Sequence, residues 1–201
     1  MLDTASKTAH RQTDGPDGVA PGVGSAIRAL RKSRALTLAD LAGRLNRSVG
    51  WLSQVERGVT EPAIRDLRRI ATEFSLPLGF FFSNDEAPEA ERGWIVRAAA
   101  RRPLGGGEDG LVEELLSPDL GGSFELIRSV FKPGTRLDKP VTRETEEAGY
   151  LISGTLDLEL HGTWFTLKPG DSFRFAGEPM RWRNPGDEEA IVIWAIAPPV
   201  Y

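Results

Sequence analysis

The spacing of apolar residues changes once along this chain. Between residues 23 and 82, apolar side chains recur every three or four positions, which is typical of amphipathic helices. After residue 124 they alternate with polar side chains in short runs, as in Leu156–Leu160, which is typical of half-buried strands. The pattern therefore predicts an all-α N-terminal domain followed by an all-β C-terminal domain.

Five helices are predicted in the first part of the chain. The two that matter most lie between Leu36 and Gly58, separated by a break at Asn46 and Arg47. Thr37 is expected to cap the first of them and Ser48 the second, because a hydroxyl oxygen accepts from the free amides of an opening turn. The other three are expected at residues 23–33, 63–74 and 78–82.

Seven short strands are predicted after residue 124, separated by turns rich in glycine, proline, asparagine and aspartate. Short alternating strands with such turns are typical of a sandwich or barrel. The predicted strands are 124–131, 148–153, 155–160, 164–167, 172–175, 180–183 and 191–197.

The composition divides the chain further. Residues 1–22 have few large apolar side chains and are expected to form a disordered tail, and residues 84–93 are acidic and are expected to form a linker. This leaves a helical domain at 23–83 and a β domain at 94–201. Although the whole chain carries a net charge of −4, residues 24–83 contain ten Lys and Arg against five Asp and Glu. That excess fits a nucleic-acid-binding module.

Other classes of protein fit the sequence poorly. The chain has no cysteine, so disulfide and thiol chemistry are excluded. It has no apolar run of the roughly 20 residues needed to span a bilayer and no signal-peptide pattern at its start. We therefore expect a cytoplasmic protein that makes no contact with membranes.

The segments Ala39–Ala42 and Leu52–Gly58 resemble the lambda-repressor-like (XRE) family of helix-turn-helix domains. The resemblance implies that the helix after Ser48 enters the major groove of double-stranded DNA. Gln54, at its middle, is expected to contact a base, and Arg47 and Arg57 are expected to meet phosphates. The residues expected at the DNA are Thr37, Arg47, Ser48, Val49, Gly50, Trp51, Ser53, Gln54 and Arg57.

The turns of the β domain resemble the cupin family, which forms a jelly-roll barrel. Gly134, Glu147 and Gly154 match the first cupin motif, and Pro169–Asp171 with Asn184 match the second. Metal-binding cupins hold their ion with two His, a Glu and a third His. Here the corresponding residues are Pro140, Thr142, Glu147 and Met180, and only Glu147 has a suitable donor. No metal and no other cofactor is therefore expected.

A metal-free barrel can enclose a small ligand. The resemblance places Glu147 and several aromatic and thioether side chains at the cavity, with two arginines near the same end. Each aromatic or thioether side chain is more often plain core than a ligand contact. The expected pocket residues are Arg128, Arg136, Glu147, Tyr150, Met180, Trp182 and Trp194.

Together these features predict a DNA-binding transcriptional regulator that acts as a homodimer and is controlled by a small-molecule effector in the barrel. Two alternatives stay open. One is a cupin enzyme, such as an isomerase or dioxygenase, with a helical extension. The other is a barrel that serves only for dimerisation. The sequence does not identify the effector or the operator.

Overall fold

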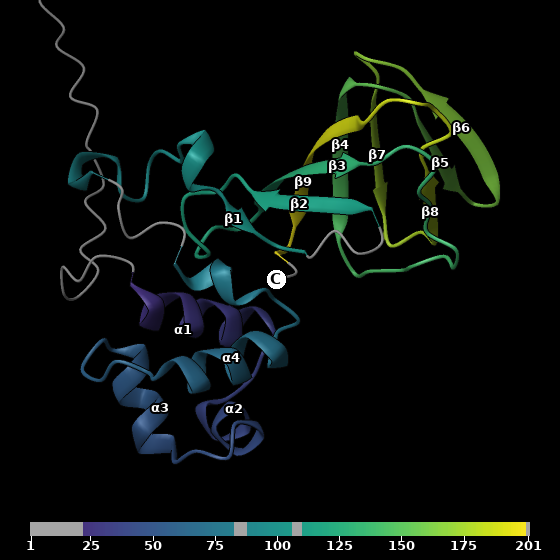
Figure 1. The fold of residues 1–201 in the computed structure, drawn as a ribbon. Coiled ribbons are helices and arrows are strands. Elements are labelled where there is room, and N and C mark those ends of the chain that lie inside the picture. The colour runs from purple at the N-terminus through teal and green to yellow at the C-terminus, as the bar shows by residue number, and fades with distance from the viewer. Residues whose placement is uncertain (1–21, 83–87, 106–109, 200–201) are drawn as a thin grey trace, which may run out of the picture.

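The structure is a computed structural model that describes residues 22–82, 88–105 and 110–199 (Figure 1). All of the predicted tail except Gly22 lies outside the described residues, as does the 84–87 part of the predicted linker. The helices gather at one end of the molecule and the strands at the other, as the apolar spacing predicts.

The helical domain contains four α-helices among residues 22–82, and the predicted fifth helix is only a 3-10 turn, η1. Gly79 lies within this turn and disfavours a longer helix. None of the helices in the described part of the chain has the length and apolar character needed to cross a membrane. The elements are α1 (Val23–Ser33), α2 (Leu38–Arg44), α3 (Val49–Glu56), α4 (Ile64–Glu73) and η1 (Leu78–Phe81).

Side-chain caps fix the ends of α2 and α3. The Thr37 hydroxyl accepts from the backbone N–H of Asp40 at 3.1 Å, and the Asp40 carboxylate accepts from the backbone N–H of Thr37 at 2.8 Å. This reciprocal capping box satisfies two amides that the helix leaves unpaired. Ser48 accepts from the backbone N–H of Trp51 at 3.1 Å and caps α3. Both predicted caps are therefore confirmed.

The helices α1 and α3 cross at very close range. A Cβ atom on Gly24 of α1 would collide with the backbone carbonyl of Val55 in α3. A glycine at this position is what allows the two backbones to approach. The crossing holds α3 against the core of the domain with its other side exposed.

The β domain consists of two antiparallel sheets. A six-stranded sheet has the order β1-β2-β3-β9-β4-β7, and a three-stranded sheet has the order β6-β5-β8. All seven predicted strands are present with small shifts at their ends. The strands are β1 (Arg102–Pro103), β2 (Leu111–Leu115), β3 (Glu125–Phe131), β4 (Glu146–Ser153), β5 (Leu156–Leu160), β6 (Thr163–Leu167), β7 (Ser172–Ala176), β8 (Met180–Arg183) and β9 (Ala190–Ala197).

The strands β1 and β2 were not predicted from the sequence. β1 has two residues, and β2 reads Leu-Val-Glu-Glu-Leu, which does not alternate. Pairing with β3 over the whole length of β2 holds this segment in the sheet. Tertiary hydrogen bonding therefore decides a strand that the local pattern leaves undefined.

Asn184, a residue of the second cupin-like motif, makes several hydrogen bonds inside the barrel. It is 1% exposed. Its amide donates to the carbonyls of Phe131 and Glu188 at 2.9 and 2.8 Å, and its side-chain oxygen accepts from Gly186 at 2.9 Å. The side chain thus joins β3 to the loop between β8 and β9.

The two domains share packing at their junction. Leu115 and Leu120 are buried in the same cluster as the helical core, and Leu104 packs against both hydrophobic clusters. The Arg102 guanidinium lies over the Phe80 ring at 5.5 Å. The helical and β domains are therefore in direct contact through β1, β2 and η1.

Candidate DNA-binding surface and barrel pocket

The exposed side of α3 carries the residues predicted to meet DNA. Leu52, Val55 and Glu56 are buried, whereas Val49, Gly50 and Gln54 are exposed and Ser53 is partly exposed. Because these outward residues follow helical spacing, they form one face along the helix. A surface helix with small and polar residues on its outer face can fit a major groove.

Gln54 is held in place by a residue beyond the end of the helix. The Thr60 hydroxyl donates to the Gln54 side-chain oxygen at 3.2 Å. A glutamine amide has two donor and two acceptor sites, so this contact leaves one acceptor and both donors for a base edge. The sequence pattern gave no sign of this contact, because Thr60 lies in the loop after Gly58.

Arg47 has a structural role that the sequence did not predict. Its Nη2 group donates to both carboxylate oxygens of Asp66 in α4, at 2.5 and 2.6 Å. The guanidinium also lies 4.8 Å from the centre of the Trp51 ring. Arg47 therefore ties the start of α3 to α4, and a phosphate would have to compete with a buried carboxylate for it.

The other predicted residues divide between caps and surface. Thr37 and Ser48 place their hydroxyl oxygens on the amides of the helices that they cap. Trp51 packs partly against the helical core. Arg57 is exposed and donates from Nε to the Ser53 carbonyl at 3.2 Å, which leaves its Nη groups available for a phosphate.

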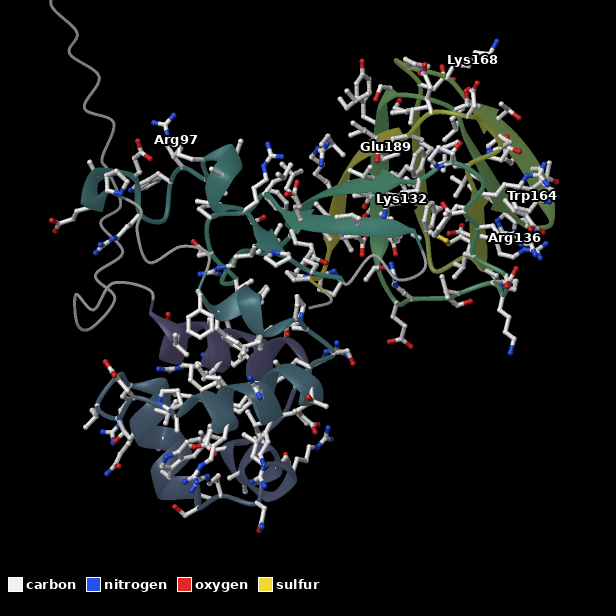
Figure 2. All side chains as sticks on the ribbon, in the orientation of Figure 1. Arg97, Lys132, Arg136, Trp164, Lys168 and Glu189 are labelled. Carbon is white, nitrogen blue, oxygen red and sulfur yellow. The ribbon has the colours of Figure 1, made fainter. Side chains whose placement is uncertain are left out.

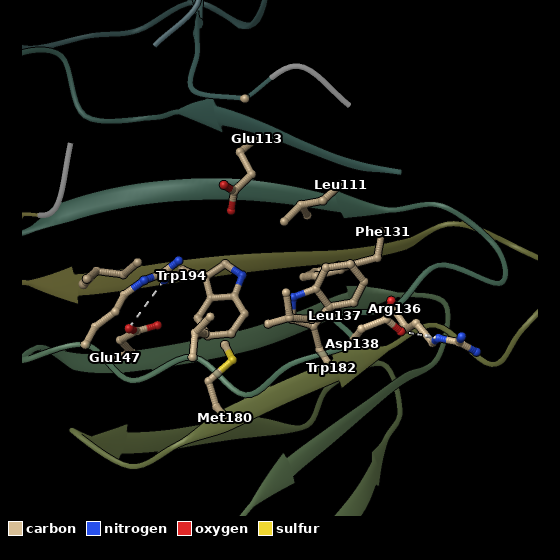
Figure 3. Close-up of a pocket in the computed structure, with 14 residues that line it drawn as sticks. Leu111, Glu113, Phe131, Arg136, Leu137, Asp138, Glu147, Met180, Trp182 and Trp194 are labelled. Carbon is tan, nitrogen blue, oxygen red and sulfur yellow. Dashed lines mark hydrogen bonds and ion pairs between the residues drawn. The ribbon is translucent and has the colours of Figure 1, made fainter. Parts of the chain in front are cut away.

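A cavity of about 600 Å³ lies inside the β domain, and Figure 3 shows the side chains around it. Aromatic and aliphatic side chains form most of the wall, and three carboxylates and two arginines complete it. The volume is within the range of pockets that hold small molecules. The lining residues are Gly105, Leu111, Glu113, Phe131, Arg136, Leu137, Asp138, Val141, Arg143, Glu147, Met180, Trp182, Trp194 and Ile196.

Five of the seven predicted pocket residues line this cavity: Arg136, Glu147, Met180, Trp182 and Trp194. Arg136 lies at the outer rim, where its Nε donates to Asp138 at 2.7 Å, and Figure 2 shows it at the far end of the β domain. Its side chain is 71% exposed. The interior of the cavity is therefore formed mainly by the other four of these residues and by apolar neighbours.

The structure does not bring Arg128 and Tyr150 to the cavity. Arg128 of β3 pairs with Glu114 of the neighbouring strand at 3.1 Å, and Tyr150 of β4 is 47% exposed. Successive residues of a strand point to opposite faces, and both side chains lie on the outer face of the six-stranded sheet. Their neighbours Ser129 and Leu151 point inward and are fully buried.

Glu113 and Arg143 were missed because their segments gave no strand signal. Glu113 belongs to β2, where its carboxylate accepts from the Ser129 hydroxyl at 2.9 Å. Arg143 lies just before β4 and approaches Glu147 at 3.7 Å. One feature of the sequence could have indicated Glu113. If residues 111–115 form a strand, one of its two adjacent glutamates has to face inward.

The donor set at the cupin metal position does not fit a metal ion. Pro140 and Thr142 replace the imidazole pair, and Met180 contributes a thioether, which is a poor ligand for hard divalent ions. Within residues 22–82, 88–105 and 110–199, no group of three or more His, Cys, Asp or Glu is arranged to hold a metal.

A smaller cleft lies at the junction between the two domains and shares residues with the barrel cavity. Its helical side is formed by Arg34 and by residues 74–76 after α4, and its β side includes Glu113, Arg143 and Ile196. These three β residues also line the barrel cavity. The same side chains thus border the cavity and the helical domain.

Comparison with known proteins gives two family matches. Residues 23–76 match the helix-turn-helix domain family, and residues 127–196 match the cupin domain family. The two matches correspond to the two structural domains.

Whole proteins with related sequences are named as transcriptional regulators. The HTH-type transcriptional regulator SutR of Escherichia coli is 26% identical over 86% of this chain and 92% of its own length. The transcriptional regulator ClgR of Mycobacterium tuberculosis is 31% identical over 48% of this chain and 87% of its own length. A crystal structure of an HTH_3 family transcriptional regulator from Vibrio cholerae is 23% identical, covers 88% of this chain and 95% of its own, and has a TM-score of 0.42.

Proposed function

Because this chain belongs to the XRE family of helix-turn-helix transcriptional regulators with a C-terminal cupin domain, we propose that it binds a specific operator through α3 and responds to a small molecule in the barrel cavity. The observation that carries the DNA-binding part is the exposed outer face of α3, with Gln54 in its last turn. A glutamine amide can form a bidentate pair with adenine in the major groove.

The test of this part is to select an operator from a pool of random duplexes with the full-length protein, and then to measure Gln54→Ala on it. We expect a loss of about 1–3 kcal/mol on the operator and little change on random DNA, because base contacts specify sequence. Thr72→Ala, at an exposed position of α4, is the matched control and should bind both duplexes normally. Equal losses of Gln54→Ala on both duplexes would show that Gln54 does not read a base.

We propose a homodimer, because one short recognition helix makes few base contacts and paired half-sites supply the rest. The outer face of the six-stranded sheet supports a contact with a second copy of the chain. Tyr150 and Ile152 of β4 are each about half exposed there, and Tyr150 pairs with the partly exposed Ile193 of β9. Exposed apolar sheet faces mark interaction sites.

Sedimentation of the full-length protein tests the dimer. Ile152→Glu should place a charge in the interface and yield monomers. Thr163→Glu, at an exposed position of the other sheet, is the control and should stay dimeric. A dimer that persists in Ile152→Glu would contradict this interface.

The effector part of the proposal rests on the cavity and on its link to the helical domain. Glu113, Arg143 and Ile196 border both the barrel cavity and the junction cleft. A ligand that moves them would change the packing beside the ends of α1 and α4. Differential affinity for two such arrangements is what an effector needs in order to change DNA binding.

An enzymatic role receives less support. The similar full-length proteins are named as regulators, and Glu147 is the one cupin metal position in this chain with a suitable donor. A cupin enzyme that activates water or oxygen needs a metal with open coordination positions. We therefore propose that the barrel is a binding domain.

A further inference from the structure

We propose that the barrel cavity selects a small molecule that carries a protonated amine, and that this amine takes the place of Arg143 beside Glu147. The inference rests on the proposed function, because it assigns a chemical class to the effector of that same cavity. It is carried by the hydrogen bonding of Glu147, by the charges of the cavity wall and by the two tryptophans.

Glu147 is a buried carboxylate with one oxygen left without a hydrogen bond. The side chain is 3% exposed, and its Oε1 accepts from the Thr145 hydroxyl at 2.8 Å. Oε2 has no hydrogen-bond partner among the described residues. Burying a charged acceptor without a donor costs free energy, so an occupant that brings an N–H group to this oxygen gains a strong, charge-assisted bond.

Arg143 compensates this charge only loosely. Its Nη1 atom lies 3.7 Å from the Glu147 carboxylate, which is beyond hydrogen-bonding distance, and its side chain is 47% exposed. Figure 3 shows this ion pair at one side of the cavity. A half-exposed arginine at such a distance can swing into solvent at little cost, which would open the carboxylate to a ligand cation.

The rest of the wall adds to the negative charge. Glu113 reaches the cavity from β2, on the other side of the space from Glu147 in Figure 3. At the rim, Arg136 and Asp138 pair with each other and balance their charges. Two inward carboxylates therefore face one loosely held arginine, and this imbalance favours a cation over an anion.

The tryptophans define the remainder of the ligand. Trp182 and Trp194 present aromatic surface beside Met180, and an ammonium group is attracted to such ring faces. The Trp194 Nε1–H group is buried and has no acceptor among the described residues. The ligand that fits best has an amine for Glu147, apolar carbon for the rings and one oxygen acceptor for Trp194.

The test uses full-length protein and three probes with four carbon atoms each: n-butylamine hydrochloride, n-butanol and sodium butyrate. Isothermal titration at neutral pH measures each affinity, with Trp fluorescence as a second signal. We expect butylammonium to bind at least about ten-fold more tightly than the other two, the size of effect that a charge-assisted hydrogen bond gives.

Each outcome separates the parts of the proposal. Equal binding of butanol, or tighter binding of butyrate, would overturn the amine assignment and leave the cavity as a ligand site. Absence of binding by all three probes would overturn the amine assignment. The DNA-binding part is measured separately through Gln54.

Variants locate the interaction. Glu147→Gln keeps the shape and the Thr145 contact but removes the charge, and should abolish the preference for butylammonium. Glu146→Gln is the matched control, because the adjacent carboxylate points outward and pairs with Arg174. Thermal unfolding of each variant confirms that it is folded.

Arg143→Met tests the displacement without altering the carboxylate. Removal of the competing cation should tighten butylammonium binding by several-fold, because the ligand no longer has to displace it. Unchanged or weaker binding in Arg143→Met would show that Arg143 and the amine do not share Glu147, and would overturn the displacement.

Discussion

Arg31 of α1 and Glu56 of α3 form a two-point ion pair. The Nε and Nη2 groups of Arg31 donate to the two carboxylate oxygens of Glu56 at 2.6 and 2.9 Å. The side chains are 11% and 4% exposed, and the hydrogen bonds that Arg31 donates to Glu56 raise the pKa of Arg31. Glu56 belongs to the motif that resembles the XRE family, and its contacts hold α3 to α1.

Glu56→Gln should lower the free energy of unfolding by about 2 kcal/mol, because it leaves the mostly buried Arg31 charge without its counter-ion. Urea denaturation measures the loss. Glu73→Gln is the matched control, since its partner Arg44 is 53% exposed and such pairs contribute less than about 1 kcal/mol. Similar losses in the two variants would contradict the structural role of Glu56.

Gly24→Ala should destabilise the helical domain by about 1–3 kcal/mol, because its methyl group would force α1 away from the Val55 carbonyl. Gly43→Ala in α2 is the control. It has nothing within 4 Å of a new Cβ, so it should stabilise the domain by about 0.5–1 kcal/mol through helix propensity. Opposite shifts in melting temperature are the expected result, and equal shifts would rule out a close helix crossing.

Arg57 and Arg47 should differ when each is replaced by alanine. Arg57→Ala should weaken binding to specific and random DNA alike and make the salt dependence shallower, as expected for a lost phosphate contact. Arg47→Ala should chiefly lower stability, because it leaves Asp66, whose side chain is 4% exposed, without its partner. Binding at several salt concentrations, measured alongside thermal unfolding, separates the two effects. An unchanged salt slope in Arg57→Ala would count against the phosphate contact.

The α2 capping box should make stability depend on acid. The hydrogen bonds from the Thr37 hydroxyl and backbone lower the pKa of Asp40. The contribution of Asp40 to the free energy of unfolding is therefore complete above about pH 4, which is the usual pKa of an aspartate in an unfolded chain. It is lost as the pH falls through the lower pKa of the folded state. Unfolding free energies of Asp40→Asn should fall less steeply than those of the unaltered protein below that pH. Parallel curves would show that the cap does not titrate.

Purified protein should contain no stoichiometric transition metal in the barrel, and a chelator should change neither its DNA binding nor its melting temperature. Proline has no side-chain donor atom, a neutral threonine hydroxyl is a weak ligand, and Glu147 alone would leave an ion mostly solvated. Elemental analysis checks this. About one Mn, Fe, Ni or Zn per chain would overturn the expectation and restore the enzyme alternative.

The sequence determined the elements whose stability is local or periodic. The helix caps at Thr37 and Ser48 and the seven predicted strands could be read directly, because a cap lies within three residues of its partner and a strand repeats every second residue. Glu147 could also be placed at the cavity, because the motif spacing fixed its strand. These features depend on neighbours along the chain.

Tertiary structure decided the roles of side chains whose partners are distant. The sequence predicts that Arg47 contacts phosphate, but the fold places Asp66 beside it. The sequence also predicts Arg128 and Tyr150 at the pocket, but the strand register points both side chains outward. The strand β2, with Glu113, formed only because β3 supplied its hydrogen bonds. A contact between residues far apart in the chain depends on how whole elements pack, and neither periodicity nor a short motif contains that information.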